Sequence, residues 1–292
     1  MMLKNYKTAN ILITGANGQL GYEFQRLFSQ LDISFIATDY AELDVTNQDA
    51  LNNFFKGKKF DYIINCAAYN DVDKAEEDAE ACYALNAKAP QYLAHIAKSM
   101  DAIFVTYSTD FVFAGDKKTP YNEEDVPNPL SVYAKSKLEG EKCVLEWYDK
   151  LFVIRTSWVF GIAGKNFNKQ VLGWAKNKSE LLIVDDQISA PTYAKDLAYF
   201  SWKLMQTNNF GLYHFSNDGQ ASKYDQAEYL LKKIGWVGTL KRAKTSDFNV
   251  KANRPAYSKL DSSKIKKVVG ENIPSWQSGI DRWLEELEGV DV

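Results

Sequence analysis

Residues 10–21 read NILITGANGQLG, a short apolar run followed by glycines at positions 15, 18 and 21. The first glycine permits a tight turn after a strand, the second lets the backbone approach a pyrophosphate, and the third allows close helix–strand packing. The first turn of the helix then offers free N–H groups and the positive end of its dipole to phosphate oxygens. The segment therefore predicts a dinucleotide site at Gly15, Asn17, Gly18, Gln19, Leu20 and Gly21.

A second part of this site is expected where the next apolar run ends. Asp39 follows Gly21 by 18 residues, a spacing at which a carboxylate can accept both hydroxyls of an adenosine ribose. The alternative is a solvated loop residue. Asp44 can reach the adenine amine while Val45 covers the ring, unless Asp44 instead caps the next helix. Small residues after a third run would let a cofactor lie against the backbone, or simply pack well: Ala67 and Ala68, followed by Tyr69.

Short β-branched runs alternate with longer helical segments through the first half of the chain. The runs are continuous rather than alternating in polarity, as expected for strands covered on both faces. They lie at 10–14, 33–38, 62–66, 103–106 and 151–154, and the helical segments lie near 19–30, 47–56, 74–99 and 131–148. This alternation predicts an α/β fold with a Rossmann-type doubly wound parallel sheet. A mixed α+β fold is the alternative.

The rhythm changes after about residue 160. Helices are expected near 166–178, beyond 192, at 222–234 and at 276–287, with strands at 181–184 and 212–215. Residues 241–262 are basic and loop-like. We expect a dinucleotide-binding domain over 1–160 with a return segment at 190–208. Residues 161–189 and 209–292 would then form a smaller carboxy-terminal α/β substrate-binding domain.

Composition excludes several classes of protein. The 292 residues are 46% hydrophobic and 25% charged with a net charge of −3, so we expect neither a nucleic-acid nor a membrane partner. The three cysteines lie far apart and read as reduced thiols of a cytoplasmic protein, and the polar stretch 1–10 lacks the apolar core of a signal peptide. Two histidines are too few for a His-rich metal site, and no metal ligand is assigned.

A possible chemical centre follows from the spacing of Tyr133 and Lys137. The two residues stand four apart on a predicted helix, so they lie on the same face. An ammonium next to a phenol lowers the phenol pKa toward the range useful for acid–base catalysis, and it can also hold a nicotinamide ribose. An exposed Tyr–Lys pair is the alternative. Ser108 and Thr109 end the fourth run, and the carboxyl ends of parallel strands line the ligand crevice.

These and further segments resemble the dTDP-4-dehydrorhamnose reductase family of the extended short-chain dehydrogenases/reductases. The glycine and Tyr/Lys motifs are shared by the whole superfamily, whereas STDFVF, RTSW and the Asp-Gln…Pro-Thr segment are much narrower. The resemblance spans nearly the whole chain. Besides the glycine loop, its segments are 65–69 with 72–76, 108–113, 133–137, 155–158, 186–187, 191–192, and 254–255 with Ser258.

The resemblance implies reduction of the 4-keto group of dTDP-4-dehydro-β-L-rhamnose to dTDP-β-L-rhamnose with NADH or NADPH. It implies that Tyr133 is the proton donor, Lys137 its partner and Thr109 the hydroxyl that orients the substrate carbonyl. Asp110 and Trp158 match positions that contact the sugar, with a turn carboxylate and a core indole as the alternatives. A monomer or a homodimer is expected. Some relatives also hold Mg²⁺ between subunits, but the sequence does not place the acidic residues for it.

Three segments depart from the family pattern, and the last two lie in the substrate half, which puts the nucleotide or sugar preference in doubt. Asn70, taken as a substrate contact, stands where the family usually has Thr. Ser189-Ala190 replaces a Gly-containing pair, and residues 222–226, SKYDQ, replace an aromatic-richer pattern. Other candidate functions therefore remain. These are another nucleotide-sugar 4-ketoreductase or epimerase, a dehydratase (which would need a Glu where Phe111 follows Thr109-Asp110), and a non-catalytic, cofactor-binding regulatory subunit.

Two side chains are candidates for the substrate diphosphate. Arg254 lies in the basic carboxy-terminal segment, and a guanidinium matches phosphate oxygens bidentately. Asn166 begins a predicted helix and could donate to the same phosphates. A surface arginine and an N-cap asparagine are the alternatives.

The residues around Asp39 also predict a cofactor preference. A carboxylate there would repel a 2′-phosphate, and no Arg or Lys lies between Ile33 and Phe55 to attract one. We therefore expect NADH to be preferred over NADPH without excluding it.

Overall fold

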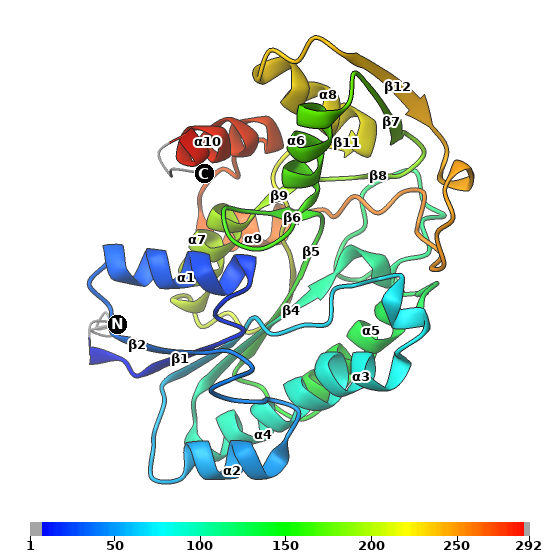
Figure 1. Ribbon diagram of the computed structural model, residues 1–292. Helices are drawn as coiled ribbons and strands as arrows, with labels where there is room; N and C mark the ends of the chain where they lie inside the picture. The colour runs from blue at the N-terminus through cyan, green and yellow to red at the C-terminus, as the bar shows by residue number, and fades with distance from the viewer. Residues whose placement is uncertain (1–7, 289–292) are drawn as a thin grey trace.

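The computed structural model describes residues 8–288, so most of the polar stretch 1–10 lies outside the described residues. Its centre is a parallel sheet of six strands in the order β10-β5-β4-β3-β1-β2 (Figure 1). The strands are β1 (Ile11–Thr14), β2 (Phe35–Thr38), β3 (Tyr62–Asn65), β4 (Ile103–Thr109), β5 (Leu151–Thr156) and β10 (Gly211–His214). The predicted Rossmann-type sheet is confirmed.

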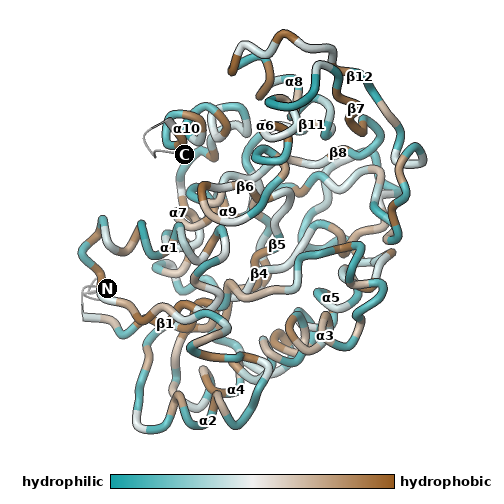
Figure 2. Tube along the Cα trace, in the orientation of Figure 1, coloured by the Kyte–Doolittle hydropathy of each residue, from teal (hydrophilic) through white to brown (hydrophobic). Residues whose placement is uncertain are grey.

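The central strands are buried on both faces, which explains their continuous apolar sequences. In β1, Ile11 and Ile13 belong to the core on one side of the sheet, and Leu12 belongs to the core on the other. Successive side chains of a strand point to opposite faces, so a strand with helices on both sides needs an apolar residue at every position. Figure 2 shows β1 as a hydrophobic segment.

Helices cover both faces of the sheet. On one side, α1 (Gln19–Gln30), α7 (Ala194–Met205) and α9 (Ser263–Val269) contribute side chains to the first core. On the other, α2 (Gln48–Phe55), α4 (Ala89–Met100) and α5 (Val132–Leu145) contribute to the second. In Figure 1, α1 and α7 lie on the opposite side of the sheet from α2 and α4.

The stretch expected to be helical over 74–99 is divided into four pieces. A 3-10 turn (Lys74–Glu76) is followed by α3 (Ala79–Tyr83), one π-helical turn (Ala84–Lys88) and then α4. The π-helical turn lies beside α5, where the absence of a side chain at Gly140 gives it room. A Cβ there would lie 2.2 Å from the Asn86 carbonyl oxygen.

The rest of the chain builds a smaller part with its own core around Phe160, Tyr193 and Trp283. Its helices are α6 (Phe167–Asn177), α8 (Lys223–Lys233) and α10 (Trp276–Glu288). Its strands pair two by two: β7 (Glu180–Val184) with β12 (Thr239–Ala243), β8 (Ile188–Ser189) with β11 (Ala221–Ser222), and β6 (Val159–Phe160) with β9 (Thr192–Tyr193). Two further 3-10 turns lie at Asp110–Val112 and Thr245–Asp247.

Two expectations from the sequence need correction. Residues 211–214, expected in the smaller domain, form β10 and pair with β5 at the edge of the large sheet. Residues 241–262, expected to be loop-like, have no helix or strand beyond Ala243 except the 3-10 turn Thr245–Asp247, but Lys241 to Ala243 lie in β12. In both cases the partner element is distant in sequence, so local composition does not reveal it. The division into domains otherwise remains a prediction.

Candidate active site

The glycine loop after β1 has the geometry that its sequence predicts. Gly15 has φ +66°, and a Cβ there would lie 2.5 Å from the Ala67 backbone nitrogen. A Cβ on Gly21 would lie 2.3 Å from the Gly15 carbonyl oxygen. Only glycine therefore allows this loop to pass so close to the end of β3 and to the start of α1.

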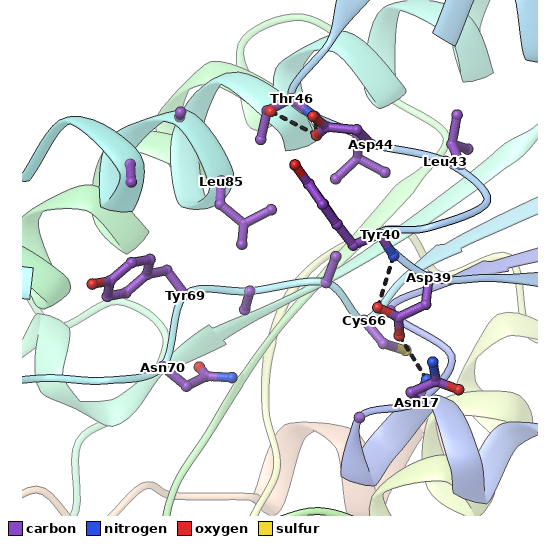
Figure 3. Close-up of a pocket in the computed structure, with 17 residues that line it drawn as sticks. Asn17, Asp39, Tyr40, Leu43, Asp44, Thr46, Cys66, Tyr69, Asn70 and Leu85 are labelled. Atoms are coloured by element: carbon purple, nitrogen blue, oxygen red, sulfur yellow. Dashed lines mark hydrogen bonds between the residues drawn. The ribbon is translucent and has the colours of Figure 1, made fainter. Parts of the chain in front are cut away.

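Asp39 directly follows β2 and is bonded to that loop. Its Oδ2 accepts a hydrogen bond from the Asn17 backbone N–H at 2.7 Å, and its Oδ1 accepts one from the Tyr40 N–H at 2.8 Å. Figure 3 shows both bonds. Each carboxylate oxygen keeps one lone pair, so Asp39 can still accept hydroxyl groups while it positions the loop.

A pocket of about 580 Å³ opens between the glycine loop, the end of β2 and the end of β3. Seventeen residues line it (Figure 3). Ten of these were predicted for the site, as cofactor or substrate contacts: Gly15, Asn17, Gly18, Asp39, Asp44, Val45, Ala67, Ala68, Tyr69 and Asn70. Asn70 lies at this pocket and is exposed. The structure therefore gathers most of the predicted cofactor residues around one cavity.

Sequence reasoning missed seven residues of the pocket wall: Tyr40, Leu43, Thr46, Cys66, Ala81, Ala84 and Leu85. In Figure 3 the Tyr40 ring extends between Asp44 and Leu85. Asp44 accepts hydrogen bonds from the backbone N–H and the hydroxyl of Thr46, whereas Asn47 caps α2. The helix-cap alternative for Asp44 is therefore wrong. Tyr40, directly after Asp39, could have been suspected from its position, but Ala81, Ala84 and Leu85 carry no such signal.

The π-helical turn connects this pocket to α5, the helix that carries Tyr133 and Lys137. The Asn86 amide pairs with the Tyr69 backbone: its Oδ1 accepts from the Tyr69 N–H at 2.9 Å, and its Nδ2 donates to the Tyr69 carbonyl at 3.0 Å. Nδ2 also donates to Ser136 Oγ, which lies on α5 between Tyr133 and Lys137. A π-helical turn inside a helix is rare and is often found at functional sites.

The pocket wall does not include five other residues predicted to bind the cofactor: Gln19, Leu20, Gly21, Tyr133 and Lys137. The Leu20 side chain is buried in the core, so it can reach a phosphate only through its backbone N–H. Gln19 donates to the Val159 carbonyl and accepts from the Asn166 side chain.

Tyr133, Thr109 and Lys137 are all buried, at 9%, 6% and 6% exposure. The Tyr133 and Thr109 hydroxyls share a hydrogen bond, and burial raises the pKa of the phenol well above its usual value. Burial lowers the pKa of Lys137 to about 8, while the nearby Glu141 carboxylate favours its charged form. The sequence predicted that Lys137 lowers the Tyr133 pKa. In this structure the hydrogen bond with Thr109 is the influence that lowers it, and this influence is smaller than the effect of burial.

Asp110, the residue after Thr109, accepts hydrogen bonds from three hydroxyl groups. Thr109 donates to its Oδ1 at 3.2 Å, and Ser189 and Ser258 both donate to its Oδ2. The side chain is 2% exposed, and burial raises its pKa to about 6 against the effect of these donors. Ser189 and Ser258 are distant in sequence, so they could not be foreseen as its partners.

Trp158 is half-buried and has φ +45°, a conformation that costs a residue with a Cβ roughly 1–2 kcal/mol. Its ring faces Lys223, whose Nζ lies 3.6 Å from the ring centroid. One face of the indole that was expected to pack on a hexose thus carries an ammonium group.

The two phosphate candidates already have partners. Arg254 donates to both oxygens of Asp73, at 3.2 and 2.6 Å. Asn166 caps α6 and uses both amide hydrogens, donating to Gln19 at 3.1 Å and to the Gly161 carbonyl at 2.9 Å. The N-cap alternative for Asn166 is thus present in the structure, and the phosphate role of both residues stays a prediction.

Within residues 8–288, no three His, Cys, Asp or Glu side chains come together as metal ligands. A search of the same residues for a bilayer-spanning helix, long and apolar enough, finds none.

The chain is similar to known proteins over nearly its whole length. Residues 9–288 match the family model described as the RmlD substrate binding domain. The chain is 38% identical to a dTDP-4-dehydrorhamnose reductase of Aggregatibacter actinomycetemcomitans, over 93% of this chain and 97% of that protein. A crystal structure of a dTDP-4-dehydrorhamnose reductase from Clostridium acetobutylicum superposes with a TM-score of 0.92 at 38% identity, covering 96% of this chain and 99% of that one. The Bacillus anthracis enzyme in complex with NADP gives 0.92 at 34% identity, covering 95% and 99%.

Proposed function

The chain belongs to the dTDP-4-dehydrorhamnose reductase family, and we propose that it reduces the 4-keto group of dTDP-4-dehydro-β-L-rhamnose to give dTDP-β-L-rhamnose. The observation that carries this proposal within the site is the buried Tyr133–Thr109 hydroxyl pair, with Lys137 one helical turn from Tyr133. Thr109 is the last residue of β4, and ligands of doubly wound sheets bind at the carboxyl ends of the strands.

The residues that line the pocket beside the glycine loop fit a nicotinamide dinucleotide. The positive φ of Gly15 and its contact with Ala67 give the close backbone approach that a pyrophosphate needs. Asp39 and Asp44 supply acceptors for the ribose and the adenine amine, and Leu43 and Leu85 supply apolar walls for the ring. The bound cofactor, NADH or NADPH, provides the hydride.

In the reaction, the phenol of Tyr133 delivers the proton to the sugar oxygen. The phenol is protonated at neutral pH, as a proton donor must be, and transfer of the proton requires that the Lys137 ammonium lower the phenol pKa in the reacting complex. Thr109 orients the substrate carbonyl through its hydroxyl, and the Lys137 ammonium holds the nicotinamide ribose and stabilises the phenolate that remains. Asp110, Trp158 and Asn70 line the sugar side, with Arg254 and Asn166 toward the diphosphate.

A reductase is favoured over a dehydratase by the residue after Asp110. Elimination of water needs an acid–base pair next to the active-site Thr, whereas Phe111 at this place packs its ring 6.2 Å from that of Tyr133. A purely regulatory role would not need the buried hydroxyl pair.

We expect NADH to be preferred over NADPH by roughly tenfold to thirtyfold, because Asp39 would repel a 2′-phosphate by about 1–2 kcal/mol after screening. Steady-state kcat/KM for both cofactors at one salt concentration measures the preference. Asp39→Ala should bring kcat/KM for NADPH closer to kcat/KM for NADH. Equal kcat/KM values for the two cofactors in the unchanged protein would mean that Asp39 does not face the 2′ position. A cytoplasmic location is part of the same proposal, since this compartment keeps thiols reduced.

The deciding experiment follows NAD(P)H oxidation with the 4-keto sugar nucleotide. The unchanged protein should turn over, and Tyr133→Phe should lower kcat by about 10²–10⁴, the usual contribution of a positioned proton donor. Cofactor binding, measured by fluorescence titration, should stay unchanged in this variant. Turnover near that of the unchanged protein would remove Tyr133 from the mechanism.

A further inference from the structure

Lys223 is a cation inside the substrate side of the site. It is the first residue of α8, follows the N-cap Ser222, and is half-buried. Its Nζ lies 3.6 Å from the centroid of the Trp158 ring and 4.6 Å from that of Phe167. A lysine at the amino terminus of a helix is disfavoured by the helix dipole, so its presence there calls for a compensating interaction.

The charge of Lys223 lacks a direct counter-ion. Across residues 8–288, Nζ makes no hydrogen bond and no ion pair; its contacts are the two aromatic rings. Burial lowers the pKa of Lys223 to about 7. The Asp110 carboxylate favours the charged form of the lysine, and the Arg254 guanidinium disfavours it. Asp110 itself is engaged by three hydroxyl donors. An ammonium with three unused N–H donors is therefore held beside the sugar site.

The other candidate cation is already neutralised. Arg254 donates two hydrogen bonds to Asp73 and one to the Ala252 carbonyl, and Asp73 also accepts from the backbone N–H groups of Lys251 and Ala252. Burying a cation is unfavourable unless an anion pairs with it. The diphosphate is the anionic group of a sugar nucleotide, so the ligand can supply what the protein does not.

We propose that Lys223 binds the diphosphate of the sugar nucleotide, held in place by the Trp158 and Phe167 rings. This proposal rests on the proposed function and names a ligand contact for it. It assigns to Trp158 the task of supporting a cation on one face, which gives a reason for its left-handed backbone.

The test measures binding of dTDP, which has the diphosphate but no hexose, to protein saturated with NADP⁺ so that the cofactor's own phosphate site is filled. Lys223→Met should raise the calorimetric Kd for dTDP by about tenfold to a hundredfold, the usual effect of losing a hydrogen bond to a charged group. Thymidine, which has no phosphate, should bind both proteins equally. Lys223→Arg should restore most of the affinity for dTDP. Lys232→Met, an exposed lysine of the same helix, is the matched control and should change nothing.

Three results would overturn the proposal. An unchanged dTDP affinity with weakened dTDP-rhamnose binding would place Lys223 on the hexose. Equal weakening for dTDP and thymidine, or a lowered melting temperature in Lys223→Met, would make the residue structural. An unchanged affinity for every ligand would exclude it from the site. If the unchanged protein does not reduce the 4-keto sugar nucleotide, the proposed function is wrong, but the Lys223 proposal is still tested. Binding of inorganic pyrophosphate to the unchanged protein and to the same variants then decides it.

Discussion

Single residues of this site show how function can oppose stability. Lys137 is 6% exposed and makes no hydrogen bond or ion pair among the residues described here, and burial lowers its pKa from 10.5 to about 8. The folded state therefore disfavours the charge that the proposed mechanism needs. Such a cost is expected where catalysis, rather than packing, selects the residue.

Lys137→Met should consequently raise stability while it abolishes most activity. A pKa lowered to about 8 corresponds to at most about 3 kcal/mol, so we expect the free energy of unfolding at pH 7 to rise by about 1–3 kcal/mol. Between pH 8 and 10.5 the unfolded state binds more protons than the folded state, so stability of the unchanged protein rises with pH in that window. The gain from Lys137→Met is then fully present below about pH 8 and fades toward 10.5.

Urea unfolding of both proteins at pH 7 and pH 10 measures this difference. Lys135→Met, at an exposed position of the same helix, should leave stability nearly unchanged at both pH values. A loss of stability in Lys137→Met would mean that the ammonium has a favourable partner in the folded protein.

At the scale of elements, the π-helical turn joins the pocket proposed for the cofactor to α5, which carries Tyr133 and Lys137. Asn86 lies in this turn and is hydrogen-bonded both to the Tyr69 backbone and to Ser136 of α5, and Gly140 leaves the space for the turn. A helix without that turn would direct the amide elsewhere.

Gly140→Ala should therefore destabilise the protein although alanine favours helices. Its Cβ would lie 2.2 Å from the Asn86 carbonyl oxygen, and overpacking of this kind typically costs about 1–3 kcal/mol. The cofactor KM should rise with it, because Asn86 holds Tyr69 at the pocket. Gly173→Ala in α6 is the control: nothing lies within 4 Å of its Cβ, so it should stabilise by about 0.5–1 kcal/mol. Thermal unfolding of the two variants decides; stabilisation by both would show that the turn can shift freely.

At the scale of the whole molecule, Asp73 joins the two parts of the chain. It lies after β3 and accepts hydrogen bonds from the backbone of Lys251 and Ala252 and from Arg254. The same carboxy-terminal segment continues to Ser258, which donates to Asp110. A contact between residues more than 170 apart in sequence thus holds the segment that leads to Ser258, a hydrogen-bond donor to Asp110.

Asp73→Ala should weaken sugar-nucleotide binding more than cofactor binding. We expect KM for the sugar nucleotide to rise by about tenfold, since hydrogen bonds to charged groups contribute about 1.5–3 kcal/mol each, while KM for NADH stays within a factor of about two. Glu77→Ala, which removes the exposed partner of Lys251, should have little effect because exposed ion pairs contribute about 0–1 kcal/mol. Equal rises in both KM values would show that the Asp73 contacts support the whole fold and not the substrate site in particular.

Local sequence determined the elements of this protein and the chemistry at their ends. The glycine loop, the doubly buried strands and the i, i+4 placement of Tyr133 and Lys137 follow from periodicity, backbone sterics and residue type, which act over a few residues. The positions of Asp39 and Thr109 at strand ends follow from the same signals, and the structure has both there.

Tertiary structure alone decided which side chains meet. That β10 joins the large sheet, that Asn86 lies in a π-helical turn, that Asp110 is surrounded by Ser189 and Ser258, and that Lys223 faces Trp158 depend on contacts between distant segments. Desolvation, which sets the pKa values of Lys137 and Lys223, arises only when those segments pack. No local pattern encodes it, because the burial of a charge is a property of all the chain around it.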